Sequence, residues 1–223
     1  MQRNNRAIII YSGGMDSFTL LNELVRSGID VRCVSFDYGQ RHSKELSFAA
    51  KVCGLLGVPH AVVDMRQIGA QLLPGSSLTS LEVAVPLGHY AQPSMKATVV
   101  ANRNMIMLSL AVGLAVSSDV PIVYTAVHAG DHAIYPDCRP EFIRSMNLVT
   151  AIANYDPVEI GAPYSMLTKG EILQRGTELS LDYALSWTCY NGREKACGRC
   201  GACVERLEAF GSLGATDPLQ YES

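Results

Sequence analysis

Residues 7–17 read Ala-Ile-Ile-Ile-Tyr-Ser-Gly-Gly-Met-Asp-Ser, and this stretch decides the fold of the chain. Its first five residues form a short apolar run rich in β-branched side chains, as in a strand that is buried on both faces of a sheet. From Asp16 onward the apolar residues recur at helical spacing, and Gly28 follows as a helix stop. The order of strand, glycine loop and helix predicts the first βα unit of an α/β fold.

The same alternation of strands and helices continues along the chain. We predict further strands at residues 31–36, 60–64, 121–127 and 158–160, and helices at 43–56, at 102–117 with Asn102 as its cap, from Pro140, after a Thr168–Glu171 capping box and at 204–210. This order predicts an open parallel five-stranded sheet with helices on both faces. Residues 65–101 lack clear periodicity, so we expect a long excursion that contacts substrate or acts as a lid.

Composition excludes several classes of protein. The chain has 223 residues, 48% of them hydrophobic and 17% charged, with a formal net charge of -3. We therefore expect a compact soluble protein without the basic field that a general nucleic-acid partner would require. No apolar run is long enough to cross a membrane, and Met1–Arg6 is not followed by a signal-peptide core. These features predict a cytoplasmic location with no membrane partner.

The glycine loop predicts an anion site. A strand that ends in Ser-Gly-Gly and continues as a helix directs backbone N–H groups and the positive helix end at one spot. Gly13 and Gly14 allow the backbone to approach a phosphate, and Ser12 and Ser17 add hydroxyl donors. Asp16 beside phosphates indicates a bridging Mg²⁺ ion, with a helix N-cap as the other interpretation. The alternative for the whole loop is a tight turn that binds nothing.

The loop also resembles a known nucleotide-binding element. It lacks both the Gly-Lys-Ser/Thr of a P-loop and the Gly-x-Gly-x-x-Gly of dinucleotide folds. It is similar to the pyrophosphate loop of the N-type ATP pyrophosphatases, the PP-loop superfamily of adenine-nucleotide α-hydrolase-like proteins with a Rossmann-like (HUP) fold. This resemblance implies ATP contacts at Tyr11, Ser12, Gly13, Gly14, Met15, Asp16, Ser17, Phe18, Thr19, Leu20 and Leu21.

Four of the seven cysteines cluster near the C-terminus in the spacing C-x7-C-x2-C-x2-C, at Cys189, Cys197, Cys200 and Cys203. Four thiolates at such spacing supply the tetrahedral set of one structural zinc ion per chain. An iron–sulfur cluster uses the same ligands and remains open at this point, whereas disulfides are disfavoured in a reducing compartment. We expect a PP-loop domain at residues 1–186 and a zinc-binding segment at 187–223 packed on it.

Several motifs narrow the resemblance further. They are Ser12–Ser17, Phe36-Asp-Tyr-Gly-Gln-Arg-His42, Asn102-Arg-Asn104, Tyr135-Pro-Asp-Cys-Arg-Pro-Glu-Phe142 and Thr188-Cys-Tyr-Asn-Gly192 with the three cysteines that follow. In this order they resemble the 7-cyano-7-deazaguanine synthase family of queuosine and archaeosine precursor biosynthesis. The chain departs from the family pattern at Ala101, where many members have proline, and at Gly130-Asp131, where a Thr-Asp pair is usual.

The resemblance implies an ATP-dependent conversion of 7-carboxy-7-deazaguanine and ammonia to the 7-cyano base, in a homodimer that works on small molecules. Transfer of the adenylyl group of ATP to the carboxylate oxygen makes that oxygen part of a good leaving group, with pyrophosphate departing into the glycine loop. Ammonia then gives an amide, and removal of the remaining oxygen requires a second activation. The demand for ATP should therefore exceed one molecule per turnover.

Candidate residues follow from these motifs. Beside Asp16, we predict that Arg103 and Lys169 neutralise phosphate charge in the transition state, the alternative being solvated surface cations. The predicted substrate contacts lie after the second and fourth strands and are Gln40, Arg41, Asp131, Tyr135, Asp137 and Arg139. The alternatives are a plain connecting loop for the first two, and turn or capping roles for the two aspartates. No histidine is expected to be catalytic.

Three other functions remain open from the sequence. A tRNA thiolase or lysidine-type ligase would share the loop and the adenylylation, although such enzymes usually carry a basic surface or an RNA-binding appendage. A nucleotide-binding sensor would hold ATP without consuming it. The product of a synthase could also serve DNA modification instead of tRNA.

Overall fold

The computed structural model describes residues 5–222, and its centre is a parallel five-stranded sheet of order β3-β2-β1-β4-β5. The strands are β1 (Arg6–Ile10), β2 (Asp30–Asp37), β3 (His60–Asp64), β4 (Ile122–Tyr124) and β5 (Glu159–Gly161). The predicted fold class is confirmed. Residues 1–4, on which part of the signal-peptide argument depends, lie outside the described residues.

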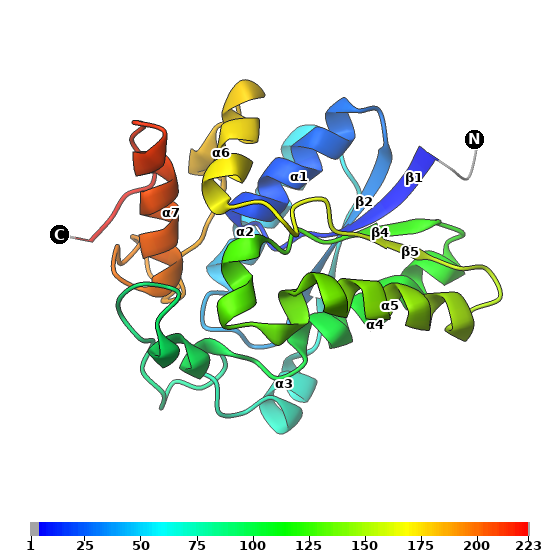
Figure 1. The fold of residues 1–223 in the computed structure, drawn as a ribbon, viewed down its shortest axis with the longest axis horizontal. Helices are drawn as coiled ribbons and strands as arrows, with labels where there is room; N and C mark the ends of the chain where they lie inside the picture. The colour runs from blue at the N-terminus through cyan, green and yellow to red at the C-terminus, as the bar shows by residue number, and fades with distance from the viewer. Residues whose placement is uncertain (1–4, 223) are drawn as a thin grey trace.

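Helices cover both faces of the sheet (Figure 1). Helices α4 (Arg103–Ser117) and α5 (Pro140–Ala153) pack on one face, and α1 (Met15–Arg26), α2 (Lys44–Leu56), α6 (Lys169–Glu178) and α7 (Gly201–Ser212) lie on the other. The remaining short elements are α3 (Arg66–Leu72) and the 3₁₀ helices Pro93–Thr98, Ala129–Ala133, Pro136–Cys138 and Tyr183–Leu185. No helix among residues 5–222 is both long and apolar enough to span a membrane.

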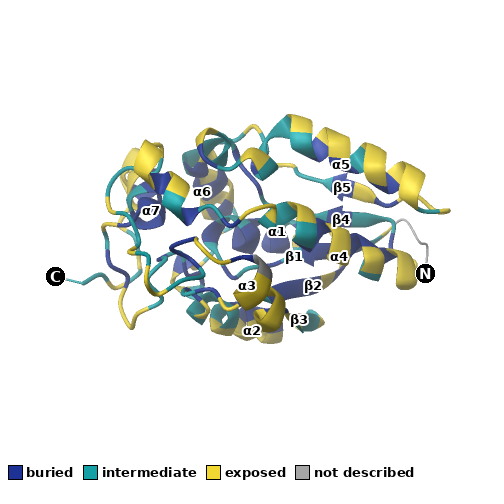
Figure 2. Cartoon of the chain, turned by 90° about the horizontal axis from the view of Figure 1, so that it is seen from below, coloured by how far each residue is buried: buried dark blue, intermediate teal, exposed yellow. Residues whose placement is uncertain are grey.

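Strand β1 is central because its side chains are apolar on both sides. Ile8 and Ile9 are fully buried and belong to the two different core clusters, as expected for neighbours on one strand. Burial of each such side chain contributes about 1.5–3 kcal/mol. Figure 2 shows the largely buried strands β1 and β2 between helices whose outer turns are exposed. This packing holds the end of β1, and the glycine loop after it, in a fixed position.

Two of the predicted helix starts are confirmed, one of them at Pro140, the first residue of α5, and a third is wrong. Thr168 accepts a hydrogen bond from the Glu171 backbone and the Glu171 side chain accepts one from the Thr168 backbone, so the capping box opens α6 as predicted. Asn102 makes no capping bond and has a left-handed backbone with φ of 54°. The cap of α4 comes instead from Asp137, whose Oδ2 accepts from the Asn104 N–H at 2.8 Å. A cap supplied by a distant segment leaves no local signal in the sequence.

The excursion at residues 65–101 contains α3 and a 3₁₀ helix, which its sequence did not predict. It is anchored by Arg41, whose guanidinium donates to the carbonyls of Ser80 at 2.7 Å and Val83 at 2.9 Å. An isolated bridge joins Leu87 to Cys200. None of its described residues lines the main cavity, but Tyr90 and Met95 line a small pocket that shares Asp131, Tyr135 and Glu205 with it. The expected substrate contact or lid stays a prediction.

The C-terminal segment is joined to the rest by a buried arginine. Arg206 of α7 is fully buried and binds the Asp217 carboxylate at 2.7 and 2.9 Å and the Tyr183 carbonyl at 2.9 Å. Ala209 and Phe210 of the same helix belong to the core on the sheet. The contacts of Arg206 with Tyr183 and of Ala209 and Phe210 with the core cross the expected boundary at residues 186 and 187. The division into two units remains a proposal.

Candidate active site

A cavity of about 220 Å³ opens at the carboxyl ends of β1, β2 and β4. It is lined by the β1–α1 loop, the segment after β2, the start of α4, the segment after β4, and parts of residues 169–205. The strand order reverses between β1 and β4, and such a switch point is where open α/β sheets bind ligands. The fold therefore places the glycine loop at the position where a ligand is expected.

The glycine loop is shaped by its own packing. Gly13 has a φ of +86°, and a Cβ there would collide with the Glu45 carbonyl oxygen at the start of α2. Gly14 is the N-cap of α1 and makes no side-chain capping bond, while its N–H donates to Ser12 Oγ at 3.1 Å. Asp16 lies in the first turn of α1, so the interpretation of Asp16 as the N-cap is wrong.

The predicted ATP contacts divide into two groups. Those that line the cavity are Tyr11, Ser12, Gly14, Met15, Asp16 and Ser17, and those that do not are Gly13, Phe18, Thr19, Leu20 and Leu21. Phe18, Leu20 and Leu21 are buried in the core beneath α1. Thr19 Oγ1 lies 3.0 Å from the Met15 carbonyl, to which it donates, and 2.7 Å from the Tyr183 hydroxyl. Only the first turn of α1 lines the cavity, and the ATP contacts themselves stay a prediction.

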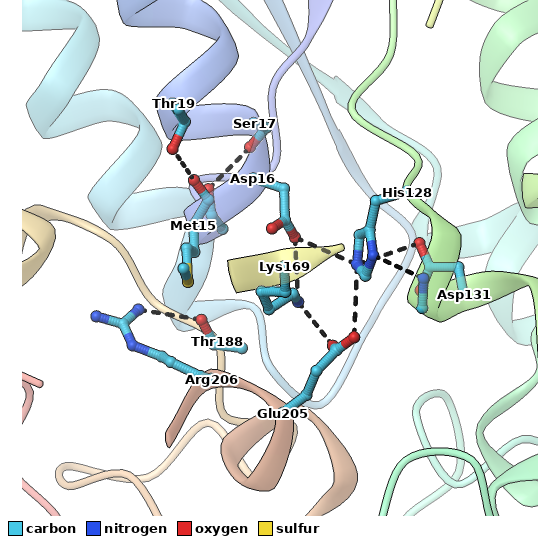
Figure 3. A network of polar contacts seen from close by, with 12 residues as sticks. Met15, Asp16, Ser17, Thr19, His128, Asp131, Lys169, Thr188, Glu205 and Arg206 are labelled. Carbon is cyan, nitrogen blue, oxygen red and sulfur yellow. Dashed lines mark hydrogen bonds and ion pairs between the residues drawn. The ribbon is translucent and has the colours of Figure 1, made fainter. Parts of the chain in front are cut away.

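Five charged or titratable side chains from four segments form one cluster in the cavity wall (Figure 3). Lys169 Nζ lies 3.2 Å from Asp16 Oδ2 and 2.8 Å from Glu205 Oε2. His128 Nε2 lies 3.8 Å from Asp16, 3.6 Å from Asp131 and 3.9 Å from Glu205. Lys169 has a side-chain exposure of only 8%, which excludes the alternative of a solvated surface cation.

Burial and charge act in opposite directions on this cluster. Burial alone would raise the pKa of Asp16, but Lys169 and then His128 outweigh it and hold the pKa below its usual value. Burial likewise opposes the charge of Lys169, yet Asp16 and Glu205 raise its pKa well above the usual value. Both groups are therefore charged at neutral pH. Asp16 Oδ1 is buried without a hydrogen-bond partner among residues 5–222, which leaves an oxygen free for a cation.

A second group of side chains, here named the aromatic compartment, lines the cavity near the carboxyl end of β2 and the first residue of α4. It consists of Tyr38, His42, Arg103, Tyr135 and Tyr190. The Tyr135 hydroxyl lies 3.1 Å from the Tyr190 hydroxyl, and the Arg103 guanidinium carbon is 6.0 Å from the centre of the Tyr135 ring. Burial raises the pKa of each of the three tyrosines, so their hydroxyls stay protonated.

Glu45 and His42 form a contact that is neutral at physiological pH. Burial raises the pKa of Glu45 to about 8, against the opposing effects of Arg103 and Gln40. Burial, followed by the charge of Arg103, lowers the pKa of His42 to about 3. The 3.4 Å approach of His42 Nε2 to Glu45 Oε1 therefore joins a protonated acid to a neutral imidazole.

Of the six predicted substrate contacts, Asp131 and Tyr135 line the cavity. Gln40, Arg41, Asp137 and Arg139 do not line this cavity, and their contact with substrate stays a prediction. Gln40 accepts from the Tyr38 backbone at 2.9 Å and donates to the Phe36 carbonyl at 3.0 Å, while Arg139 Nε donates to the His132 carbonyl at 2.9 Å. As described above, Arg41 holds the excursion and Asp137 caps α4. All four side chains shape the loops that carry other lining residues.

Two members of the charged cluster were missed from the sequence. His128 lies shortly after β4 at the switch point, a position that could have marked it as a lining residue, although no histidine was expected to be catalytic. Glu205 lies on α7, two positions after Cys203, and sequence spacing gave no sign that it meets Lys169. A Cβ at Gly130 would collide with Glu205 Oε1, which gives a physical reason for glycine at this position.

The four clustered cysteines come together as predicted. One ligand atom from each of Cys189, Cys197, Cys200 and Cys203 lies within 4.8 Å of the others, and all four residues are buried. Gly198 has a φ of +69°, which allows the turn between the second and third cysteine. Four converging sulfur atoms are a donor set that fits a metal ion, so this group can hold one. Cys203 lies in the first turn of α7 and ties that helix to the metal site.

Comparison with known proteins adds to this geometry. The sequence matches the family described as queuosine biosynthesis protein QueC over residues 6–214. The chain belongs to the QueC family. Among QueC relatives, the proteins named 7-cyano-7-deazaguanine synthase from Alteromonas mediterranea and Hahella chejuensis are 62% and 61% identical over 219 residues. The matches cover 98% of this chain, and 100% and 94% of the two relatives.

Solved structures with similar folds have low sequence identity to this QueC family member. NMN synthetase from Francisella tularensis has a TM-score of 0.54 at 14% identity, over 95% of this chain and 78% of the other. An NH3-dependent NAD synthetase from Campylobacter jejuni has a TM-score of 0.50 at 15% identity, over 81% and 66% of the two chains. These likenesses support the PP-loop type of α/β fold and carry no conclusion about substrate.

Proposed function

We propose that this QueC family member is an ATP-dependent carbon–nitrogen ligase that converts 7-carboxy-7-deazaguanine and ammonia to 7-cyano-7-deazaguanine, in queuosine-type 7-deazapurine biosynthesis. The names of relatives about 60% identical over nearly their whole length support this activity. The observation that carries the proposal is the joining of a phosphate-binding loop, a charged cluster and an aromatic compartment in one cavity. Such a cavity can bring a nucleotide and a flat organic acid together.

The nucleotide is proposed to bind with its phosphates at the glycine loop. Ser12, Gly14 and Ser17, with the N-terminus of α1, would hold the leaving pyrophosphate, and Lys169 would neutralise its growing charge. The unpartnered oxygen of Asp16 and the carboxylate of Asp131 fit a Mg²⁺ ion, which prefers oxygen ligands. When bound there, Mg²⁺ would screen the phosphate charges and so assist displacement at the α-phosphate.

The proposed reaction balances in two stages. A carboxylate oxygen attacks the α-phosphorus of ATP and pyrophosphate leaves, after which ammonia displaces AMP and loses a proton to give the amide. The amide oxygen then attacks a second ATP, pyrophosphate leaves again, and loss of AMP with the amide protons gives the nitrile. Each stage removes one oxygen from the substrate carbon as part of AMP. Lys169 and the N-terminus of α1 serve both stages, because both expel the same leaving group.

The metal held by the four cysteines is proposed to be one structural zinc ion per chain. Four thiolates complete a tetrahedral site and leave no position for water, so a structural role fits better than a catalytic one. Residues 187–223 are proposed to form a zinc-binding segment on the PP-loop domain of residues 1–186. Metal analysis together with the visible absorption spectrum tests this proposal, because an iron–sulfur cluster would absorb there and zinc would not.

The chain is further proposed to act in the cytoplasm as a homodimer, as the family resemblance implies, with no nucleic-acid partner. Helix α5 carries large apolar side chains that are exposed in the single chain, including Leu148 at 70% and Ile152 at 86%. Sedimentation velocity tests the dimer directly. A dimer that dissociates on Ile152→Asp substitution would place α5 in the interface, whereas a monomeric parent protein would refute the dimer.

The activity is tested by measuring ATP consumption in the presence and absence of 7-carboxy-7-deazaguanine, with ammonium and Mg²⁺ present throughout. A ligase consumes ATP only when the acid is added. Nucleotide binding without consumption would favour a sensor instead. Consumption that depends on unmodified tRNA and not on the acid would favour the tRNA-modifying relatives.

A further inference from the structure

Arg103 is a cation without an acidic partner in the cavity wall. It is the first residue of α4, and no aspartate or glutamate of residues 5–222 is within ion-pair distance of its guanidinium. The other cations near this site differ, because Lys169 contacts two carboxylates and Arg206 binds Asp217 at 2.7 Å. A guanidinium partly withdrawn from water is favoured where an anion meets it, and residues 5–222 place no anion within ion-pair distance of this one.

The groups around Arg103 are aromatic. Arg103 interacts with Tyr38 and lies near the face of Tyr135, and its charge lowers the pKa of the His42 imidazole. Glu45 is the acid whose pKa the charge of Arg103 lowers, but burial outweighs this effect, and with a pKa of about 8 Glu45 is protonated at neutral pH. The positive charge of Arg103 is therefore left uncompensated within the aromatic compartment.

Hydrogen bonds fix the walls of the compartment before any ligand arrives. The Tyr135 hydroxyl lies 2.5 Å from Thr98 Oγ1 and 3.1 Å from the Tyr190 hydroxyl, so its polar end is already satisfied by the protein. The rings of His42 and Tyr190 lie 5.8 Å apart, centre to centre. Rings held in this way offer flat apolar surfaces to a ligand, and flat heteroaromatic rings are what such surfaces bind best.

The aromatic compartment and the charged cluster adjoin in one cavity, but Arg103 and Lys169 contact different groups within it. The contacts of Arg103 described above are with Tyr38, Tyr135 and their neighbours, whereas Lys169 contacts Asp16 and Glu205. The glycine loop, the N-terminus of α1 and Lys169 are thus already proposed to bind the phosphates. A second cation set among aromatic rings is better matched to the anionic group of a planar co-substrate.

We propose that the aromatic compartment is the recognition site for a planar heteroaromatic acid, and that Arg103 binds the carboxylate that is to be activated. This rests on the proposed function and replaces the earlier expectation that Arg103 neutralises phosphate. It has a chemical consequence. The acid is an anion, whereas the amide intermediate and the nitrile product are neutral. Arg103 therefore forms an ion pair with the acid and with neither of the later species, and so selects the first substrate.

Two substrates that differ only in this charge provide the test. Steady-state kinetics are measured for 7-carboxy-7-deazaguanine with ammonium, and for the corresponding primary amide without ammonium, each with Mg-ATP. With Arg103→Gln, the KM for the acid should rise roughly 100-fold, as expected for loss of one partner of an enclosed charge pair, and the KM for the amide should change less than about 3-fold. The matched control is Arg175→Gln, since Arg175 pairs with Glu23 outside the cavity and should leave both values unchanged.

A binding measurement separates this inference from the proposed function. Calorimetric titration of each protein with the acid alone should show binding that Arg103→Gln weakens to a similar degree, and the variant should keep its melting temperature within about 2 °C because no acidic partner is lost. Equal losses for acid and amide, or a rise confined to the KM for ATP, would overturn the inference. Arg103-dependent binding of the acid without its conversion would support the inference and refute the proposed ligase.

Discussion

Removal of Lys169 should destabilise the unliganded protein strongly. Its ammonium joins Asp16 at 3.2 Å and Glu205 at 2.8 Å, and the three side chains are only 8%, 20% and 10% exposed, so water screens their charges little. Breaking an enclosed ion pair by deletion of one partner costs about 3–5 kcal/mol. For a chain of this size, about 2–4 °C per kcal/mol predicts that Lys169→Met lowers the melting temperature by roughly 6–20 °C.

Calorimetric melting of four proteins tests the origin of this loss. They are the parent, Lys169→Met, Glu205→Gln and the double variant. The double variant should melt above Lys169→Met, because it no longer leaves two carboxylates without a cation. Activity gives an independent measure, since loss of a cation at the leaving group should lower kcat about 10²- to 10³-fold even at saturating ATP. A melting temperature of Lys169→Met within about 2 °C of the parent would refute the described charge balance.

Three further predictions concern the glycine loop, the buried carboxyl of Glu45 and the metal. Gly13→Ala should lower the urea-unfolding free energy by about 2 kcal/mol or more, because φ is +86° and the new Cβ would collide with the Glu45 carbonyl; unchanged stability would contradict this packing. Glu45 has its folded pKa raised from 4.5 to about 8, so its contribution to stability is fully present below about pH 4.5 and is lost as pH rises through 8. The unfolding free energy of Glu45→Gln, relative to that of the parent, should therefore rise by on the order of 3–5 kcal/mol from pH 4.5 to pH 8. Unfolding free energies that change with pH in parallel for the two proteins would exclude the raised pKa. Chelation, or Cys200→Ser, should remove one metal ion per chain and speed amide hydrogen exchange in α7, as elemental analysis and exchange mass spectrometry would show; a metal-free chain with an unchanged α7 would contradict the anchoring role of Cys203.

The elements that the sequence predicted well are those set by local pattern. The strand at residues 60–64 and the helix from Pro140 were placed at the residues where the structure has them, because apolar periodicity and helix-start residues are local. The four cysteines converge for the same reason, since three of them lie within seven residues of one another. The parallel sheet that these elements form has its switch point between β1 and β4, and the cavity lies there.

The contacts between distant segments could not be predicted. Lys169 meets Glu205 across 36 positions of the sequence, and no pattern records that α6 and α7 place these two side chains together. The same limit hid the role of Asp137 at the start of α4. Phe18 and Leu21, which were assigned to the ATP site by resemblance, lie on the apolar face of α1 as helical spacing already indicates, and their assignment stays a prediction.

The most direct test of the account uses 7-carboxy-7-deazaguanine with ¹⁸O in both carboxylate oxygens, incubated with the protein, Mg-ATP and ammonium. Mass spectrometry then follows the base, AMP and pyrophosphate together. Adenylylation of acid and then amide predicts the unlabelled nitrile, two molecules of AMP per nitrile with one ¹⁸O in each, and unlabelled pyrophosphate. Formation of ADP with ¹⁸O in phosphate, or an untouched acid while ATP still binds, would contradict the adenylyl-transfer mechanism or the substrate.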